Sequence, residues 1–433
     1  MTSPPNTPPA NLPTDPEAWR LIDTGAPCEW VEDYRPGGFH PVNLGDQFSD
    51  GRYKVIRKLG DGSYSTVWLA VDSRTPRYVA LKIMVAKAST TDIELSILNH
   101  LAQLAPEDTN SEHVTTLLDT FTHDGPNGIH RCLVFEPMGP TAASLVDELP
   151  ENKPKKFGKP QRYPYWIAKR VLHHTLRGLA FLHQNGVVHG DVQPGNLLFA
   201  IDDISAMSEA EVKQDETSTA VPVERVDRKD DRWAPKQLYL KQSLHQRVRL
   251  GSDLCVKLSD LGTAFWATSP PSNTVTPLGL RAPELILHKP FGTGIDIWSF
   301  GCLIFEFLTG KQLFAVMMLR HEQEEQDEAD DDHLIQINEI IGPLPQSIMD
   351  AWPRAPKWYG PEGQRLEPYT DHDGGSEPYK FEPLDVLFTQ HKPPEINDEE
   401  SRTVCKLVQH IFQYDPAQRP SAVEILKHPW FLE

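Results

Sequence analysis

A series of short motifs in a fixed order limits the possible folds of this 433-residue chain more than any other feature. A glycine-rich turn at 60–62 lies between two segments, 53–59 and 65–71, whose alternating β-branched residues predict strands. Two polar motifs, at 189–196 and 258–262, come later, after the pattern has become helical. Each motif alone is common, but the whole set in this order is not. The order predicts a strand-rich part followed by a helical part.

The glycine turn and the next strand carry groups suited to holding phosphates. Gly60 and Gly62 would let backbone amides approach a phosphate closely. Lys82 lies on the third predicted strand, 78–84, and Glu94 lies on the helix predicted at 92–101. A lysine in this position can hold nucleotide phosphates when a carboxylate positions it. Taken singly, each would be an ordinary surface residue, so the prediction depends on their combination.

The segment 189–196 has the residue types that phosphoryl transfer requires. A carboxylate must orient a hydroxyl group and accept its proton, and Asp191 suits that role. Magnesium prefers oxygen ligands, which Asn196 and, after a polar stretch, Asp260 would provide. The predicted cofactors are therefore ATP and Mg²⁺.

Three later motifs complete the set, at 281–284, 296–301 and 415–420. A buried Glu284 would need a cationic partner, and Arg419 is the natural choice. Together with the earlier motifs, these match the protein-kinase signature from the glycine loop to the last helix.

The chain further resembles the SR-protein kinase family, whose members phosphorylate serines in arginine–serine-rich proteins. The resemblance covers residues 29–433 and rests on the lead-in at 32–42, the segment at 45–48 and Asp260-Leu261-Gly262 in place of Asp-Phe-Gly. It implies an α+β, bilobal protein-kinase fold, with a small β-rich N-lobe carrying one main helix and a larger α-helical C-lobe. The expected reaction is transfer of the ATP γ-phosphoryl group to serine or threonine of basic proteins, including Arg/Ser-rich ones.

The resemblance also divides the chain and assigns a nucleotide site. The expected parts are a flexible Pro-rich tail (1–28), a lead-in (29–52), the N-lobe (53–137) and the C-lobe (138–433), with a partly disordered insertion at 201–252 and an acidic insert around 322–332. The implied adenine-site residues are Leu59, Val67, Ala80 and Leu198, with hinge contacts from Glu136 and Met138.

Several positions depart from the usual kinase pattern. Gln193 stands where a lysine normally neutralises the transferring phosphoryl group, and loss of such a charge commonly costs about 10² to 10³ in rate. Pro277 stands where a threonine usually contacts the catalytic aspartate, with Thr276 beside it, and Gly190 replaces a common arginine. We expect Gln193 to act in catalysis as a weaker substitute. A nucleotide-binding pseudokinase or scaffold is the main alternative, and a small-molecule kinase is a weaker one.

The net charge limits the kinds of partner that we expect, and the cysteines indicate the compartment. A formal net charge of −19 disfavours direct binding to nucleic acid or an anionic membrane and suits a basic protein partner. The acidic run at 322–332 is either part of a substrate groove or a solvated loop. Five scattered cysteines fit a reducing compartment, the cytoplasm or the nucleus. We expect a monomer.

Overall fold

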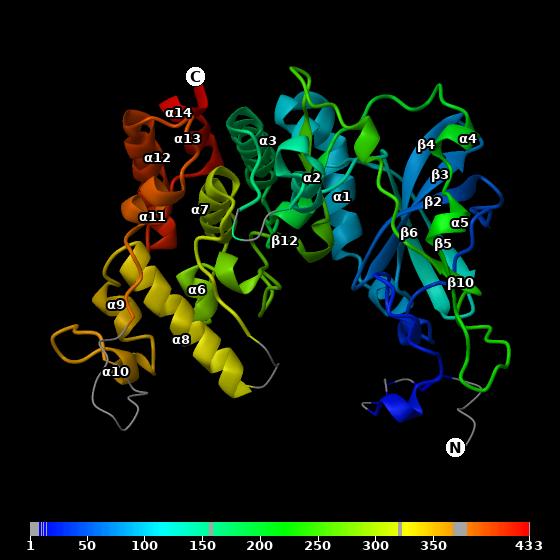
Figure 1. Ribbon diagram of the computed structural model, residues 1–433, viewed down its shortest axis with the longest axis horizontal. Helices are drawn as coiled ribbons and strands as arrows, with labels where there is room; N and C mark the ends of the chain where they lie inside the picture. Colours follow the sequence, from blue (N-terminus) through cyan, green and yellow to red (C-terminus); the bar gives the residue numbers. More distant parts are fainter. Residues whose placement is uncertain are drawn as a thin grey trace. The chain divides into compact units, whose positions relative to one another are not determined.

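The computed structural model describes residues 8–9, 11, 13, 15–155, 158, 160–318, 323–366 and 379–432. The chain forms two compact units: unit 1 comprises Met1–Leu104, Thr115–Pro140 and Leu198–Leu254, and unit 2 comprises Ala105–Val114, Thr141–Leu197 and Cys255–Glu433. One unit is built on a sheet and the other is mostly helical (Figure 1), which agrees with the expected α+β fold. Within the described part of the chain, no helix is long and apolar enough to cross a lipid bilayer.

Unit 1 is built on an antiparallel sheet of six strands in the order β1-β2-β3-β4-β6-β5. The strands are β1 (Gln47–Phe48), β2 (Tyr53–Gly62), β3 (Ser65–Asp72), β4 (Arg77–Met84), β5 (Leu117–Gly125) and β6 (Gly128–Phe135), and the main helix is α1 (Ile93–Leu104). One face of the sheet packs into a core that includes Trp68, Leu81 and Val134, each at most 1% exposed. Because side chains alternate across a strand, Lys82 and Ala80 lie on the opposite face of β4 from Leu81.

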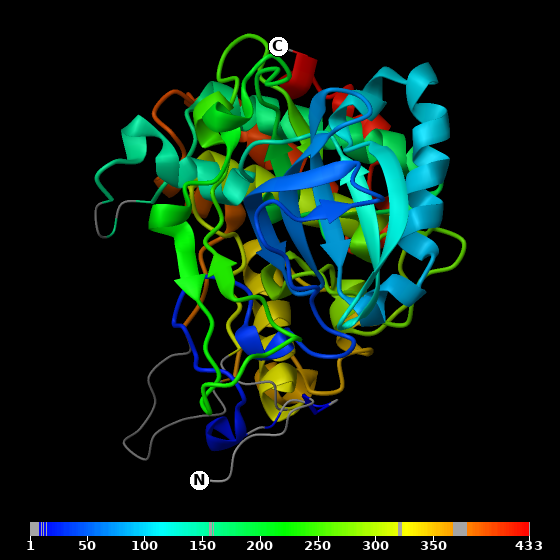
Figure 2. The ribbon, with the colours of Figure 1, turned by 90° about the vertical axis from the view of Figure 1, so that its right-hand side faces the viewer.

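The predicted disorder of the insertion at 201–252 is corrected by the structure. The segment contains α4 (Glu209–Val212), α5 (Glu216–Thr219), β9 (Ala220–Pro222) and β10 (Gln237–Tyr239), and it belongs to unit 1, not to the helical unit. Figure 2 shows this green segment beside the blue strands. The insertion has few aromatic residues, but Val212 and Tyr239 are buried against the sheet, and Gln214 N donates to Ile56 O at 2.8 Å. An open strand edge has unpaired backbone groups, and hydrogen bonds to those groups stabilise the folded insertion.

The lead-in segment is tied to the same insertion by buried charges. Arg20 is 1% exposed and pairs with both Glu32 and Asp231, while Arg225 also pairs with Asp231 at 3.0 Å. Buried charges of this kind are tolerated only when they are paired. The N-terminal part of unit 1 and the insertion therefore hold each other in place through these ion pairs.

Unit 2 is organised around two long helices, α3 and α7, which contact each other. Its elements are α2 (Ala142–Glu148), α3 (Tyr165–Gln184), β7 (Val187–Val188), β11 (Val256–Leu258), β12 (Phe265–Trp266), α6 (Pro283–Ile286), α7 (Gly294–Thr309), α8 (Gln323–Ile340), α9 (Gln346–Met349), α10 (Ala355–Trp358), α11 (Leu384–His391), α12 (Asp398–Ile411), α13 (Ala422–Leu426) and α14 (Pro429–Leu432); a further strand, β8 (Leu197–Phe199), crosses the boundary between the units. Most of α7 is buried, including Trp298 and Phe300 at 0% exposure.

The predicted pairing of Glu284 with Arg419 is confirmed. The two guanidinium nitrogens Nη1 and Nη2 lie 2.5 and 2.7 Å from Oε1 and Oε2 of Glu284, so the contact is bidentate. Arg419 also lies over the ring of Trp298, 5.0 Å from its centroid. A planar, bidentate contact is the arrangement that best offsets the cost of burying two charges.

The acidic insert at 322–332 is helical in the structure, contrary to the loop-like character expected from its composition. Glu322 lies outside the described residues, and the next residue begins α8. Asp331 is 0% exposed and accepts from Trp352 Nε1 at 2.6 Å and from Arg354 Nε at 2.8 Å. Part of this acidic run therefore anchors the helix internally, and tertiary partners stabilise a helix that its own sequence favours weakly.

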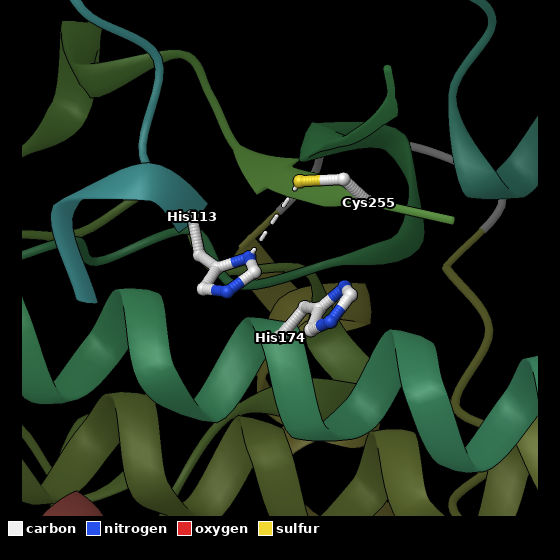
Figure 3. A group of neighbouring side chains, drawn as sticks. All are labelled: His113, His174 and Cys255. Atoms are coloured by element: carbon white, nitrogen blue, oxygen red, sulfur yellow. Dashed lines mark hydrogen bonds between the residues drawn. The ribbon is translucent and has the colours of Figure 1, made fainter. Parts of the chain in front are cut away.

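A pair of stacked histidines holds the strand that leads to Asp260. The rings of His113 and His174 lie 4.1 Å apart and are nearly parallel. His113 Nδ1 donates to Val256 O at 3.0 Å, and Val256 N donates to His174 Nδ1 at 3.2 Å. Cys255 lies beside the two rings (Figure 3), and the three side chains are close enough to suggest a metal site. Because both Nδ1 atoms already bind the peptide groups of Val256, we interpret the cluster as a clamp on β11.

These histidines make stability depend on pH. Burial lowers the pKa of His113 to about 4 and that of His174 to about 2. Since both values lie below the unfolded value of about 6.5, their contribution is complete above that pH and is lost as pH falls below it. We expect the free energy of unfolding to fall by about 1.4 kcal/mol per buried histidine between pH 7.5 and 5.5. Denaturant unfolding at the two pH values would measure it. In His174→Gln the free energy of unfolding should fall by that much less, whereas in the control His410→Gln, at an exposed position, it should fall as much as in the unaltered chain.

Candidate active site

Lys82 and Glu94 form an ion pair in unit 1. The Nζ of Lys82 lies 2.8 Å from Oε1 of Glu94, and each side chain is 12% exposed. Glu94 is in the first turn of α1, where the helix dipole favours a carboxylate. Lys82 is on β4, so its ammonium group is held at a fixed place beside the sheet. A lysine held in this way is the arrangement that nucleotide phosphates require.

The residues expected around the adenine base come from neighbouring strands of unit 1. Val67 lies directly opposite Lys82, and Leu69 lies opposite Ala80, so Val67 and Ala80 share the face that carries Lys82. Leu59 is partly buried on β2, just before the glycine turn. These three apolar residues therefore lie on or beside one face of the sheet.

The expected hinge residues follow β6. Met138 is 7% exposed, and Glu136 is partly buried. Gly139 N donates to Phe199 O at 2.8 Å, which brings the strand containing Leu198 alongside this connection. All six residues that the resemblance implies for the nucleotide base therefore belong to unit 1.

In unit 2, Asp191 lies at the centre of a small hydrogen-bonded group. Gln193 Nε2 donates to both carboxylate oxygens, at 2.7 and 2.8 Å. Asn196 Nδ2 donates to Asp191 Oδ2 and to its backbone oxygen, both at 2.8 Å. These neutral amide donors fix the orientation of the carboxylate, as a group that accepts a proton requires.

The backbone of this loop is held by a buried carboxylate. His189 N and Gly190 N donate to the two oxygens of Asp296 at 2.8 Å each, and Asp296 is 1% exposed. Gly190 has φ +78°, and a Cβ there would lie 3.3 Å from both the Phe265 ring and Thr263 O. The absence of the usual arginine at this position therefore has a local cause, since only glycine adopts this conformation without strain.

The usual kinase pattern has a threonine at position 277, where this chain has a proline, and in the structure the neighbouring Thr276 contacts the catalytic loop instead. Thr276 Oγ1 donates to Gly190 O at 2.6 Å, and Thr276 is 1% exposed. The hydroxyl thus binds the backbone of the catalytic loop one residue before Asp191. Pro277 caps the short turn at Leu278–Leu280.

Asp260 lies at the end of β11 in a left-handed conformation, with φ +61°. Such a conformation is uncommon for a residue with a side chain and is characteristic of functional sites. Ser259 N and Ser259 Oγ both donate to Asn196 O at 2.9 Å, so the segments carrying Asp260 and Asn196 are joined directly.

The donor set fits magnesium and a nucleotide. The amide nitrogen of Asn196 is used by Asp191, so the amide oxygen of Asn196 is one candidate ligand, and the carboxylate of Asp260 is the other. Oxygen ligands are those that magnesium prefers. In unit 1, nothing lies within 4 Å of a Cβ built on Gly60 or Gly62, so the turn has open space for phosphates.

One site residue, Glu306 on α7, was not predicted from the sequence. It lines a small cavity with Gln193, Pro194, Pro277, Gly279, Leu280, Gln312 and Leu313. Burial raises the pKa of its carboxyl group to about 7, and among the described residues this group has no cationic partner. The apolar helix around it gave no signal for such a role, because only the fold brings it beside the catalytic loop.

The chain matches the family model described as "Protein kinase domain" over residues 53–212 and 243–431. The gap between these two ranges falls within the insertion. The serine/threonine-protein kinase SRPK of Physarum polycephalum is 28% identical over 94% of this chain and 91% of its own length. Protein kinase dsk1 of Schizosaccharomyces pombe is also 28% identical, over 94% of this chain and 85% of its own. The expected resemblance to SR-protein kinases is confirmed by these relatives.

A solved structure supports the fold. The crystal structure of the PF14_0431 kinase domain superposes with a TM-score of 0.60, covers 91% of this chain and 98% of its own, and is 24% identical.

The contact between Gln193 and Asp191 leads to a testable prediction. Gln193→Lys would add a positive charge at the position where a neutral amide now lies, next to the group that accepts the proton. We expect kcat for phosphoryl transfer to rise by about 10- to 100-fold, because a preorganised charge stabilises the transition state. Steady-state kinetics with saturating ATP would measure it. An unchanged or lower kcat would show that the missing lysine at position 193 does not limit the rate. Gln312→Lys adds the same charge elsewhere in the lining of the cavity and serves as the control.

Proposed function

The chain belongs to the protein kinase family, and we propose that it is a serine/threonine kinase that uses ATP and Mg²⁺ to phosphorylate basic proteins, including Arg/Ser-rich ones. The single observation that best supports activity is the geometry at Asp191, whose carboxylate is oriented by two neutral amides and paired with no cation among the described residues. The named SR-protein kinase relatives support the substrate class.

The proposed mechanism assigns each polar group one task. Lys82, positioned by Glu94, would hold the phosphates, and Asn196 and Asp260 would hold magnesium. Bound Mg-ATP supplies the phosphoryl group and much of the charge neutralisation. Asp191 would orient the acceptor hydroxyl group and receive its proton.

Glu306 supports a basic substrate. Its partly buried carboxylate has no cationic partner among the described residues and faces a cavity beside the catalytic-loop residue Gln193. A guanidinium group entering this cavity would supply the missing partner and would favour the ionised carboxylate. Such a contact would select substrates with an arginine near the acceptor residue.

The acidic face of α8 gives weaker support. Several carboxylates there are already occupied: Asp331 and Asp327 pair with Arg354, and Asp330 lies 4.0 Å from Arg281. The helix still contributes to the net charge of −19, which would attract a basic partner at low ionic strength.

For location, we propose the cytoplasm, the nucleus, or both. All five cysteines are free thiols, three of them buried, which suits a reducing compartment.

The first experiment measures transfer of labelled phosphate from Mg-ATP to a peptide of repeated Arg-Ser. We expect transfer that falls by at least about 10³-fold in Asp191→Asn, because the proton acceptor is lost while nucleotide binding is kept. Intact nucleotide binding with no transfer to this peptide, to general basic proteins or to the chain itself would instead indicate a pseudokinase. Transfer to an aminoglycoside but to no protein would indicate a small-molecule kinase.

A second experiment tests the arginine contact. Glu306→Gln should lower kcat/KM for an arginine-containing peptide by about tenfold, the effect of losing one charged hydrogen bond. A matched peptide with leucine for arginine should be unaffected. In the unaltered enzyme, kcat/KM for the arginine peptide should rise as pH increases through about 7, since Glu306 ionises there, and this rise should disappear in the variant. Equal losses for the two peptides, or a similar loss in the exposed control Glu399→Gln, would contradict the assignment.

A further inference from the structure

A buried lysine lies at the base of the glycine turn. Lys58 is 0% exposed and forms ion pairs with Glu29 and, at 3.3 Å, with Asp61 of the turn. Its ammonium group thus joins a residue of the lead-in to a residue between the two phosphate-loop glycines.

Glu29 is held firmly on the lead-in side. Tyr34 Oη donates to Glu29 Oε1 at 2.5 Å, and the other carboxylate oxygen binds Lys58. Burial and the nearby Glu29 carboxylate raise the pKa of Tyr34 well above its usual range. The neighbouring Cys28 Sγ donates to the backbone oxygen of Tyr239, in the insertion, at 3.4 Å.

The backbone of Lys58 is bound by the insertion. Lys58 N donates to Gln214 Oε1 at 2.7 Å, and Gln242 N donates to Lys58 O at 2.9 Å. Both polar backbone groups of this residue on β2 are therefore satisfied from outside the sheet. The insertion and the lead-in converge on one residue.

The turn beyond Lys58 is held by backbone pairing but by few side chains. The pairing of β2 with β3 is irregular between Lys58 and Gly60 and then continues to Gly62 and Ser65. A Cβ built on Gly60 or Gly62 would meet nothing within 4 Å, and Tyr64 is 56% exposed. Because side-chain packing adds little order to this turn, a tether from Lys58 to Asp61 would restrict its motion further.

We propose that Lys58 is a positioning residue that orders the phosphate-binding turn through Asp61, and that the lead-in and the insertion thereby set the affinity for ATP. This inference rests on the proposed role of Gly60 and Gly62 in nucleotide binding. Ordering the turn before the nucleotide arrives lowers the entropy cost of binding, so the expected effect is on nucleotide affinity and not on the chemical step.

Asp61→Asn gives the sharpest test, because it removes the tether and leaves the buried pair of Lys58 and Glu29 intact. We expect KM for ATP and Kd for a fluorescent ATP analogue to rise about fivefold, with kcat unchanged. Simple electrostatics predicts the opposite sign, since removing a carboxylate near phosphates should tighten binding. An unchanged or lower Kd would overturn the proposal. Asp124→Asn, an exposed carboxylate on the hairpin of β5 and β6, controls for net charge and should leave Kd unchanged.

A second pair of variants tests the lead-in. Glu29→Gln should also raise Kd for the ATP analogue about fivefold, and combining it with Asp61→Asn should add little, because both changes break one chain of contacts. Glu32→Gln is the matched control, as Glu32 is a buried carboxylate in the same segment that binds Arg20 and does not contact Lys58. Equal weakening by Glu32→Gln, or full additivity of the first two changes, would overturn the proposal. If Glu29→Gln does not fold, the result with Asp61→Asn decides.

Failure of this inference and failure of the proposed function give different results. Binding of the analogue is measured without any acceptor protein, so it does not depend on phosphoryl transfer. No binding to the unaltered chain would contradict the nucleotide site itself. Normal binding that Asp61→Asn does not weaken would contradict only the role of Lys58.

Discussion

The hydrogen bonds from the catalytic loop to Asp296 are the constraint on which the rest of the helical unit depends. This carboxylate is 1% exposed, and a buried charge in that setting must be fully bonded to be tolerated. It accepts from the backbone of His189 and Gly190 and from the ring of His183. Because nearly all of α7 is buried, the loop that carries Asp191 is fixed to the core. The positive φ of Gly190 is part of the same arrangement.

In unit 1, part of the edge of β2 has no strand beside it, and the glycine turn is held by backbone pairing with few side-chain contacts. The chain stabilises both with segments from outside the strands. The insertion binds the backbone of Ile56 and Lys58, and the lead-in pairs with the Lys58 ammonium group. The same two segments are joined to each other through Arg20 and Asp231. The fold of the small unit is therefore completed by residues that a general protein kinase signature would not include.

Acidic residues are numerous in this chain, but their roles differ with their surroundings. Asp296 and Asp331 are buried and bonded, and they hold the structure together. Glu306 is also largely buried but has no cation beside it among the described residues, which is why its pKa is raised and why we assign it to substrate recognition. Composition alone could not separate these cases, since all three are simply carboxylates in the sequence.

The sequence by itself determined the fold class, and it supplied the candidate residues for the nucleotide site and the catalytic loop. Local motifs such as Asp191 to Asn196 combine residue types whose chemistry does not depend on distant partners, and alternating or helical apolar patterns are set by burial of one face. The pair of Glu284 and Arg419 could also be predicted, because a buried charge demands a partner and the choice was narrow.

Only the tertiary structure decided the order of the insertion at 201–252, the helical state of the acidic run, and the positions of Lys58 and Glu306. The first two have weak intrinsic preference and are stabilised by distant residues, such as the edge of β2 and Arg354. The roles of Lys58 and Glu306 arise from neighbours far away in the chain, Glu29 for one and the wall of the cavity for the other. Contacts between remote residues leave no local pattern, so a single sequence cannot reveal them.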